Sequence, residues 1–149
     1  MTENYKSKSV DETIKIGQNI ALRLTNGDII TLDGDLGAGK TVITRGITEA
    51  LDIHAHVCSP TYTIVNEYIG DSNSKVSSVF HFDTYRLTGS DDFLDSGLEE
   101  YFYRDGICII EWSSVIEDLL EEMTDRRIIR VTITGTGEER DIVIDGFDS

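Results

Sequence analysis

The sequence predicts an α/β fold of three layers, with helices on both faces of a mostly parallel central sheet and an antiparallel hairpin near the C-terminal end. Three observations predict it. Residues 29–32 and 107–110 are short apolar runs rich in β-branched side chains, as is typical of parallel strands buried on both faces. Segments with apolar residues at helical spacing follow both runs. A glycine-rich motif joins the first run to its helix.

This motif, GDLGAGKT at residues 34–41, matches the phosphate-binding pattern G-x-x-x-x-G-K-[ST] at every fixed position. Its glycines allow backbone conformations that a Cβ would forbid, so that successive N–H groups can turn toward phosphate oxygens. Lys40 adds a full positive charge, and Thr41 begins the next helix, where its hydroxyl is left to bind Mg²⁺. The motif therefore predicts a P-loop NTPase-like fold and a site for a nucleoside triphosphate.

The other elements are predicted from residue spacing along the chain. Residues 1–8 are polar and are expected to be loose. Ser9 and Glu12 form a capping-box pattern at the start of the first helix. We expect helices or helical turns over residues 10–24, 41–51, 90–94, 98–103 and 115–123, strands over residues 29–32, 76–82 and 107–110, and a hairpin over residues 128–134 and 141–144 that adds antiparallel strands to the sheet.

Composition excludes several classes of protein. Acidic residues number 28 and basic residues 13, which gives a formal net charge of −15 at pH 7. Because binding to nucleic acid backbones depends on clustered Lys and Arg, any contact with RNA is expected to run through a partner. No apolar run approaches the roughly 18 residues of a membrane span, and the N-terminal segment lacks a signal-peptide core. We expect residues 1–149 to form one cytoplasmic domain, with Cys58 and Cys108 as reduced thiols.

The segment CSPTYTIVNEY, residues 58–68, has two interpretations. Pro60 favours an extended conformation at Ser59, and the residues that follow alternate as in a strand. The segment can be an ordinary edge strand. Alternatively, Thr61 and Thr63 stand where P-loop proteins often carry a nucleotide-sensing loop, from which a threonine can reach Mg²⁺ or the γ-phosphate. Spacing alone leaves both interpretations open.

Two acidic residues end predicted strands. Asp83 closes the segment HFD, and Glu111 follows residues 107–110 directly. Each acid can be a solvated strand end. However, ligands bind at the carboxyl ends of strands in open α/β sheets, and a P-loop in the same chain favours the hypothesis that one or both bind Mg²⁺ or orient the attacking water.

Four further side chains could take part in catalysis or metal binding, but the sequence does not assign either role to them. Arg86 can neutralise transition-state charge or pair with one of the two carboxylates, and the sequence leaves both roles open. His54, His56 and His81 are not accompanied by other metal ligands at a suitable spacing. We expect these histidines to be structural or incidental.

Four motifs in order, GDLGAGKT, SPTYTIVNEY, HFDTYRL and IEWSS, resemble those of the bacterial TsaE family, also called YjeE, over almost the whole chain. The resemblance implies a small Mg²⁺-dependent ATPase that works with the proteins TsaB and TsaD in forming threonylcarbamoyladenosine on tRNA. In that family TsaD transfers the threonylcarbamoyl group, and ATP hydrolysis supports turnover of the complex. Contact with tRNA is therefore expected only through the partners.

The resemblance also implies roles for individual residues. Lys40, Asp83 and Glu111 form the catalytic group, and Thr41, Asp83 and Glu111 surround Mg²⁺. Thr61 and Thr63 take the switch-like role, and the family's early signature places Thr13 near the adenine. The nucleotide is held by Asp35, Leu36, Gly37, Ala38, Gly39, Lys40 and Thr41. One departure follows the Glu-Trp pair, where the family commonly has proline and an acid and this chain has Ser113 and Ser114.

Other functions compete with this hypothesis. A small-molecule kinase is of similar size, but such enzymes usually carry an arginine-rich lid, whereas residues 88–105 contain a single basic residue, Arg104, among several acids. A GTPase is disfavoured because neither N-K-x-D nor D-x-x-G follows the P-loop. A module that binds ATP without hydrolysing it stays open, because the intrinsic turnover of a lone subunit can be very slow.

Overall fold

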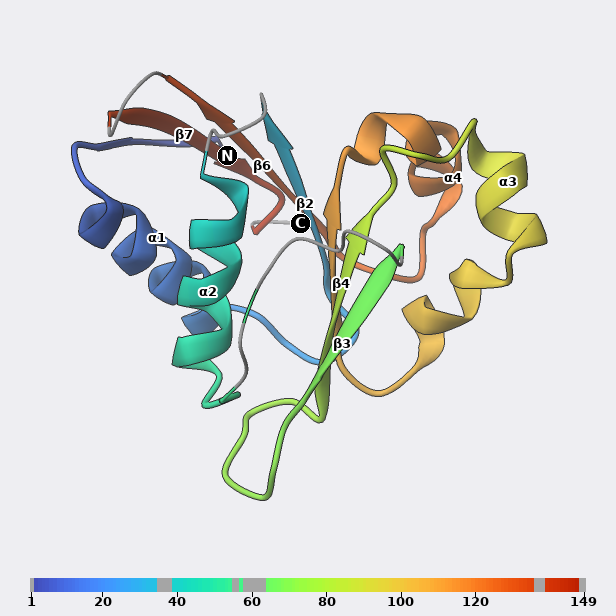
Figure 1. The fold of residues 1–149 in the computed structure, drawn as a ribbon, viewed down its shortest axis with the longest axis horizontal. Helices are drawn as coiled ribbons and strands as arrows, with labels where there is room; N and C mark the ends of the chain where they lie inside the picture. Colours follow the sequence, from blue (N-terminus) through green and yellow to red (C-terminus); the bar gives the residue numbers. More distant parts are fainter. Residues whose placement is uncertain (1, 35–38, 55–56, 58–63, 136–138, 148–149) are drawn as a thin grey trace.

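The structure is a computed structural model that describes residues 2–34, 39–54, 57, 64–135 and 139–147. A seven-stranded sheet has the order β1-β7-β6-β2-β5-β4-β3 (Figure 1). Its strands are β1 Glu3–Ser7, β2 Ile29–Gly34, β3 Val65–Ile69, β4 Ser78–Asp83, β5 Ile107–Glu111, β6 Ile128–Thr134 and β7 Arg140–Asp145. The helices are α1 Val10–Leu22, α2 Lys40–Ala50, α3 Ser90–Asp95 and α4 Glu117–Glu122, with 3₁₀ turns η1 Leu98–Tyr103 and η2 Ser113–Ile116.

The centre of the sheet is parallel. Strands β6, β2, β5 and β4 run in one direction, while β3 pairs antiparallel with β4 at one edge and β7 pairs antiparallel with β6 near the other. The predicted α/β fold and the hairpin are thus confirmed. One detail was wrong, because β6 enters the parallel part of the sheet beside β2 and only β7 continues it antiparallel.

The prediction that residues 1–8 are loose was also wrong. These residues contain β1, which pairs antiparallel with β7 from Glu3↔Ile144 to Ser7↔Arg140. Arg23, at the end of α1, donates two hydrogen bonds of 2.7 and 3.0 Å to the Glu3 carboxylate. Main-chain pairing and this ion pair stabilise an edge strand whose side chains are mostly polar, so its sequence carries no apolar alternation to reveal it.

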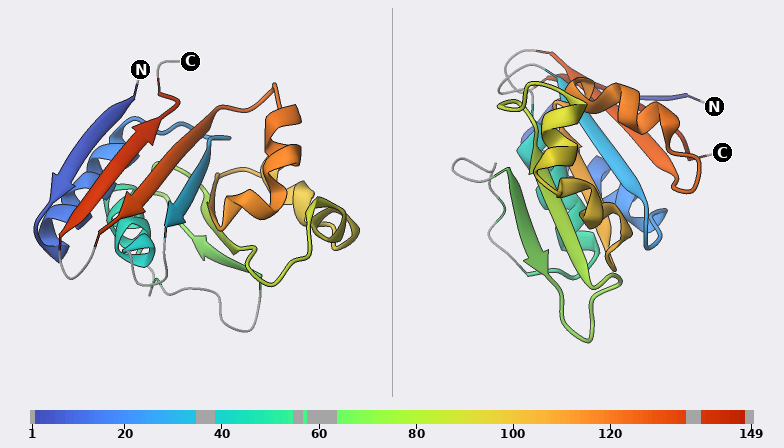
Figure 2. Two further views of the ribbon diagram at one scale, coloured as in Figure 1. Left: turned by 90° about the horizontal axis from the view of Figure 1, so that it is seen from above. Right: turned by 90° about the vertical axis from the view of Figure 1, so that its right-hand side faces the viewer.

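Helices cover both faces of the sheet (Figure 2). Each face has its own apolar core. The α1–α2 pair packs on the side to which Ile30, Leu32 and Ile109 point. The opposite side, with Ile29 and Ile110, packs against α3, η1 and α4. The helix predicted over residues 115–123 is divided, because η2 precedes α4.

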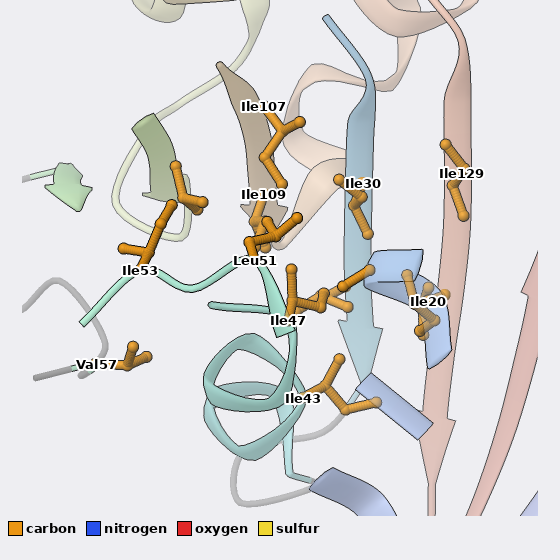
Figure 3. Close-up of a cluster of buried hydrophobic side chains, with 14 of the residues drawn as sticks. Ile20, Ile30, Ile43, Ile47, Leu51, Ile53, Val57, Ile107, Ile109 and Ile129 are labelled. Carbon is orange, nitrogen blue, oxygen red and sulfur yellow. The ribbon is translucent and has the colours of Figure 1, made fainter. Parts of the chain in front are cut away.

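On the α1–α2 side, isoleucines fill the space between helices and sheet. Figure 3 shows Ile43 and Ile47 of α2 and Ile20 of α1 extending toward Ile30 and Ile129 of the strands. The side chains named here are fully buried. This packing fixes α2 over the parallel strands and thereby sets the position of its first residue, Lys40.

Within the described ranges, no helix has the length and apolar character required to cross a membrane.

Candidate nucleotide and metal site

The candidate site lies where β2 leads into α2. The carboxyl ends of β2 and β5 and the first turn of α2 lie at the same edge of the sheet, which is the upper edge in Figure 1. Gly39 is the N-cap of α2 and has φ 102°, a left-handed conformation that favours glycine. Asp35, Leu36, Gly37 and Ala38 lie outside the described residues, so their contacts with a nucleotide stay predictions.

Lys40 connects three parts of this edge. Its side chain is buried, and its Nζ donates a 3.0 Å hydrogen bond to the carbonyl oxygen of Gly34 at the end of β2. The same nitrogen lies 4.3 Å from the centroid of the Trp112 ring. Because Trp112 directly follows Glu111, this contact brings the end of β5 next to the beginning of α2. Thr41 is half-buried in the first turn of α2.

Asp83 and Glu111 lie side by side, as the strand-end argument requires. They are register partners in the parallel pair of β4 and β5. Alternation along each strand places both on the face that packs against α1 and α2, and α2 begins at Lys40. Glu111 is only 3% exposed, whereas Asp83 is half-buried and its Oδ1 accepts a 3.0 Å hydrogen bond from the Tyr85 N–H.

These residues fit a magnesium ion that arrives with a nucleotide. Mg²⁺ prefers oxygen ligands and is commonly bound by one or two carboxylates together with substrate phosphates. Thr41, Asp83 and Glu111 provide oxygen donors at one edge of the sheet. Among the described residues, no cluster of three His, Cys, Asp or Glu side chains could hold a metal by itself. The donor set therefore suits an ion shared with phosphates.

His81 has a place in this site that the sequence did not indicate. Its side chain is 0% exposed, and its Nε2 lies 2.5 Å from Oε2 of Glu111. Its Nδ1 lies 3.0 Å from the hydroxyl of Tyr68 on β3. We predicted a structural or incidental role for His81, and the structure gives it direct contact with a predicted metal ligand. One signal was available, since His81 stands two residues before Asp83 and so shares its face of β4.

Asp33 is a second residue that sequence reasoning missed. The Ser113 N–H donates to Oδ1 of Asp33 over 2.9 Å, and the Ser113 hydroxyl donates to Oδ2 over 2.5 Å. Trp112, between Glu111 and Ser113, has a left-handed backbone with φ 61°. Two hydrogen bonds from Ser113 to Asp33 therefore connect the turn after Glu111 to the end of β2. Ser113 stands at the position where the family resemblance leads us to expect proline.

Thr13 lies near Gly39, the N-cap of α2, and its hydroxyl has partners of its own. The Thr13 methyl carbon lies 4.0 Å from the position that a Cβ on Gly39 would take. Its Oγ1 shares a 2.7 Å hydrogen bond with the Ser7 hydroxyl and donates to the Ser9 carbonyl over 3.2 Å. Nearby is a cavity of about 390 Å³, lined by Lys6, Ser7, Lys8, Gly135, Glu139, Arg140 and Asp141. The role of Thr13 beside the adenine stays a prediction.

Four of the residues singled out in the sequence lie outside the described ranges: His56, Cys58, Thr61 and Thr63. The choice between an edge strand and a sensing loop therefore stays open for residues 58–63. From Val65 onward, β3 is an antiparallel edge strand. In the part of the chain that the structure describes, Arg86 is exposed and forms no ion pair with Asp83 or Glu111. Burial raises the pKa of the Cys108 thiol to about 12, which makes it an unreactive thiol.

Comparisons with known proteins show the family of this chain. Residues 7–142 match the family described as threonylcarbamoyl adenosine biosynthesis protein TsaE. The tRNA threonylcarbamoyladenosine biosynthesis protein TsaE of Bacillus subtilis is 39% identical over 138 residues, which cover 93% of this chain and 82% of that protein. The protein of the same name from Treponema pallidum is 34% identical over 89% of this chain and 94% of its own.

A solved structure is similar as well. The crystal structure of Bacillus subtilis YdiB superposes with a TM-score of 0.74 at 31% sequence identity, covering 99% of this chain and 86% of that one. The similarity thus extends over the sheet, both helical layers and the edge where Lys40, Asp83 and Glu111 gather. The family match covers the strands and α2 that carry these residues. This chain belongs to the TsaE family.

Proposed function

We propose that this protein binds ATP with Mg²⁺, hydrolyses it, and thereby supports turnover of a TsaB–TsaD complex that forms threonylcarbamoyladenosine in tRNA. Membership of the TsaE family supports a role in this biosynthesis. One observation carries the ATPase part of the proposal: Asp83 and Glu111 are register partners at the strand edge where Lys40 begins α2. A lysine, a hydroxyl and two carboxylates at one edge suit triphosphate chemistry.

Each side chain has a defined task in this proposal. Lys40 pairs with the β- and γ-phosphates, which requires that its amine exchange the Gly34 carbonyl for phosphate oxygens. Thr41, Asp83 and Glu111 hold Mg²⁺, which when bound offsets the charge on the phosphate oxygens. The aromatic ring of Trp112 covers the Lys40 amine and excludes water from that side.

The charge of the chain supports an indirect contact with tRNA. A net charge of −15 repels a phosphate backbone, so the partners TsaB and TsaD are assigned the contact with RNA. The alternatives are a small-molecule kinase and a nucleotide-binding module without hydrolysis. The acidic stretch over residues 88–105 does not suit the arginine-rich lid of a kinase.

Lys40→Ala tests the nucleotide site. We expect ATP affinity to fall by about tenfold or more, because a charge-assisted contact contributes about 1.5–3 kcal/mol. Binding is measured by the fluorescence of Trp112, whose ring contacts the Lys40 amine. Lys75→Ala, which removes an exposed lysine from the loop before β4, is the matched control and should bind normally. Equal affinities in both variants, with circular dichroism spectra like that of the unchanged protein, would exclude Lys40 as a phosphate ligand.

The same proteins then separate hydrolysis from binding. ATP hydrolysis is measured for the protein alone, with TsaB–TsaD, and with TsaB–TsaD and tRNA, and modified adenosine is quantified in the same reactions. The proposal requires that hydrolysis and repeated modification both depend on Lys40. ATP binding without hydrolysis in any mixture would favour the non-hydrolysing module, and phosphate transfer to an added small molecule would favour the kinase.

A further inference from the structure

Glu111 belongs to a buried triad with Tyr68 and His81, two residues that have no role in the mechanism given above. The triad crosses three strands, since Tyr68 lies on β3, His81 on β4 and Glu111 on β5. We propose that Tyr68 and His81 are positioning residues, which fix the Glu111 carboxylate in the orientation needed to bind the metal ion of the nucleotide. This inference rests on the proposed ATP and Mg²⁺ site and assigns a function to two residues within it.

Polar side chains at this depth require a reason. The exposed fractions are 6% for Tyr68, 0% for His81 and 3% for Glu111. Apolar side chains fill the neighbouring positions on the same face, among them Val79, Ile107 and Ile109. Burying a carboxylate and an imidazole is costly unless each is hydrogen-bonded. Three apolar residues would pack there at lower cost, so stability alone does not account for this choice of side chains.

The chemistry of the three side chains determines which atom donates and which accepts in each hydrogen bond of the triad. A carboxylate can only accept, so the proton at the 2.5 Å contact belongs to Nε2 of His81. In a neutral imidazole the other nitrogen then accepts, and it accepts from the Tyr68 hydroxyl at 3.0 Å. Tyr68 thus selects the tautomer that donates to Glu111. The centroids of the tyrosine and histidine rings lie 5.9 Å apart, with their planes tilted by 46°. Because the imidazole is 0% exposed and both of its nitrogens have a partner, its rotation is restricted.

This arrangement leaves a defined part of Glu111 for the metal. The bond from His81 uses Oε2, so Oε1 would be the oxygen that Glu111 offers to the ion. Glutamate has three rotatable bonds, and one fixed oxygen restricts all of them, so less conformational entropy is lost when the metal binds. Partners that orient a metal ligand in this way typically change metal affinity by about 10–100-fold.

The test measures the coupling between metal and nucleotide. For each variant, the affinity for a non-hydrolysable ATP analogue is determined in EDTA and in saturating Mg²⁺, and the ratio of the two affinities is the metal coupling. A purely structural defect lowers both affinities together and leaves the ratio unchanged. His81→Phe should reduce the ratio by about tenfold or more. Tyr68→Phe removes only a hydroxyl and should reduce it by about threefold or more.

Two control variants separate the loss of the hydrogen bonds to Glu111 from a general effect of the substitutions. Tyr101→Phe removes a tyrosine hydroxyl on the opposite face of the sheet and should leave the ratio unchanged. His81→Gln, whose amide can donate to Glu111, should recover part of the coupling that His81→Phe loses. If His81→Phe does not fold, Tyr68→Phe decides alone, since it keeps the buried ring.

Two results would overturn the inference in different ways. If the unchanged protein binds the analogue more tightly with Mg²⁺ and the Tyr68→Phe and His81→Phe variants keep its ratio, the positioning role is wrong while the proposed function stands. If the unchanged protein shows no coupling between Mg²⁺ and the analogue, the proposed metal site itself is wrong.

Discussion

At the scale of single residues, the candidate site depends on contacts that hold acidic side chains in place. Glu111 contacts His81, and Asp33 accepts two hydrogen bonds from Ser113. The two hydrogen bonds between Ser113 and Asp33 hold the turn between β5 and η2 against the end of β2. A proline at position 113 would lack the main-chain N–H and could not donate this bond. In this chain, serine therefore provides both bonds to Asp33.

Ser113→Ala tests this contact. The substitution removes the buried hydroxyl but keeps the N–H, so Asp33 loses one of its two hydrogen bonds from Ser113. We expect the free energy of unfolding to fall by about 1.5–3 kcal/mol, the range for a hydrogen bond to a charged group. Urea unfolding at neutral pH measures it. Ser114→Ala, at the exposed neighbouring position, should change stability by less than about 0.5 kcal/mol, and equal effects of the two changes would contradict the assigned role.

At the scale of elements, the position of Lys40 depends on how closely α1 and α2 pack. The two helices touch at Gly17 and Gly46, where a Cβ on Gly17 would lie 2.6 Å from the Ile43 carbonyl oxygen. A Cβ on Gly46 would collide with the main chain of Ile14. Any larger residue would force the helices apart and would move the first turn of α2 relative to β2 and β5.

Gly46→Ala separates helix propensity from packing. Alanine favours a helix over glycine by about 1 kcal/mol, whereas overpacking a tight contact costs about 1–3 kcal/mol. Because the obstructing atoms are main chain and cannot rotate away, we expect the packing cost to exceed the gain in helix propensity and the net loss in urea unfolding to reach about 2 kcal/mol. Arg45→Ala, on the exposed face of the same helix, is the control. A Gly46→Ala protein as stable as the unchanged one would show that the helices can separate without cost.

At the scale of the whole molecule, the excess of acidic residues sets the response to salt. With 28 acidic and 13 basic residues, repulsion between carboxylates outweighs attraction. Exposed ion pairs oppose this trend only weakly, because pairs such as Arg23–Glu3 contribute about 0.2–1 kcal/mol each. Repulsion also disfavours the approach of ATP without a cation, in agreement with the proposed need for Mg²⁺.

Added salt should therefore stabilise the fold. Raising NaCl from ~10 mM to ~100 mM shortens the Debye length from about 30 Å to about 10 Å and screens the repulsion. We expect the urea midpoint of unfolding to increase over this range and to level off at higher salt. KCl at equal ionic strength should give the same curve, since screening does not depend on the identity of the ion. A falling midpoint would mean that ion pairs outweigh repulsion.

The sequence by itself determined the features that depend on neighbouring residues. The P-loop motif, the capping pattern at Ser9 and the apolar runs that form β2 and β5 are local, and each predicted its element within a few residues. Polarity at the end of a strand was sufficient to select Asp83 and Glu111 as candidates. The chemistry proposed for the site therefore comes from the sequence.

Only the tertiary structure decided which residues meet. Tyr68, His81 and Glu111 are separated by 13 and 30 residues along the chain, and Ser113 lies 80 residues from Asp33. Strand β1, with its polar side chains, is recognisable only beside β7. These contacts follow from the order and register of the strands. Strand order is the result of packing both helical layers at once, and no periodicity within a single segment records it.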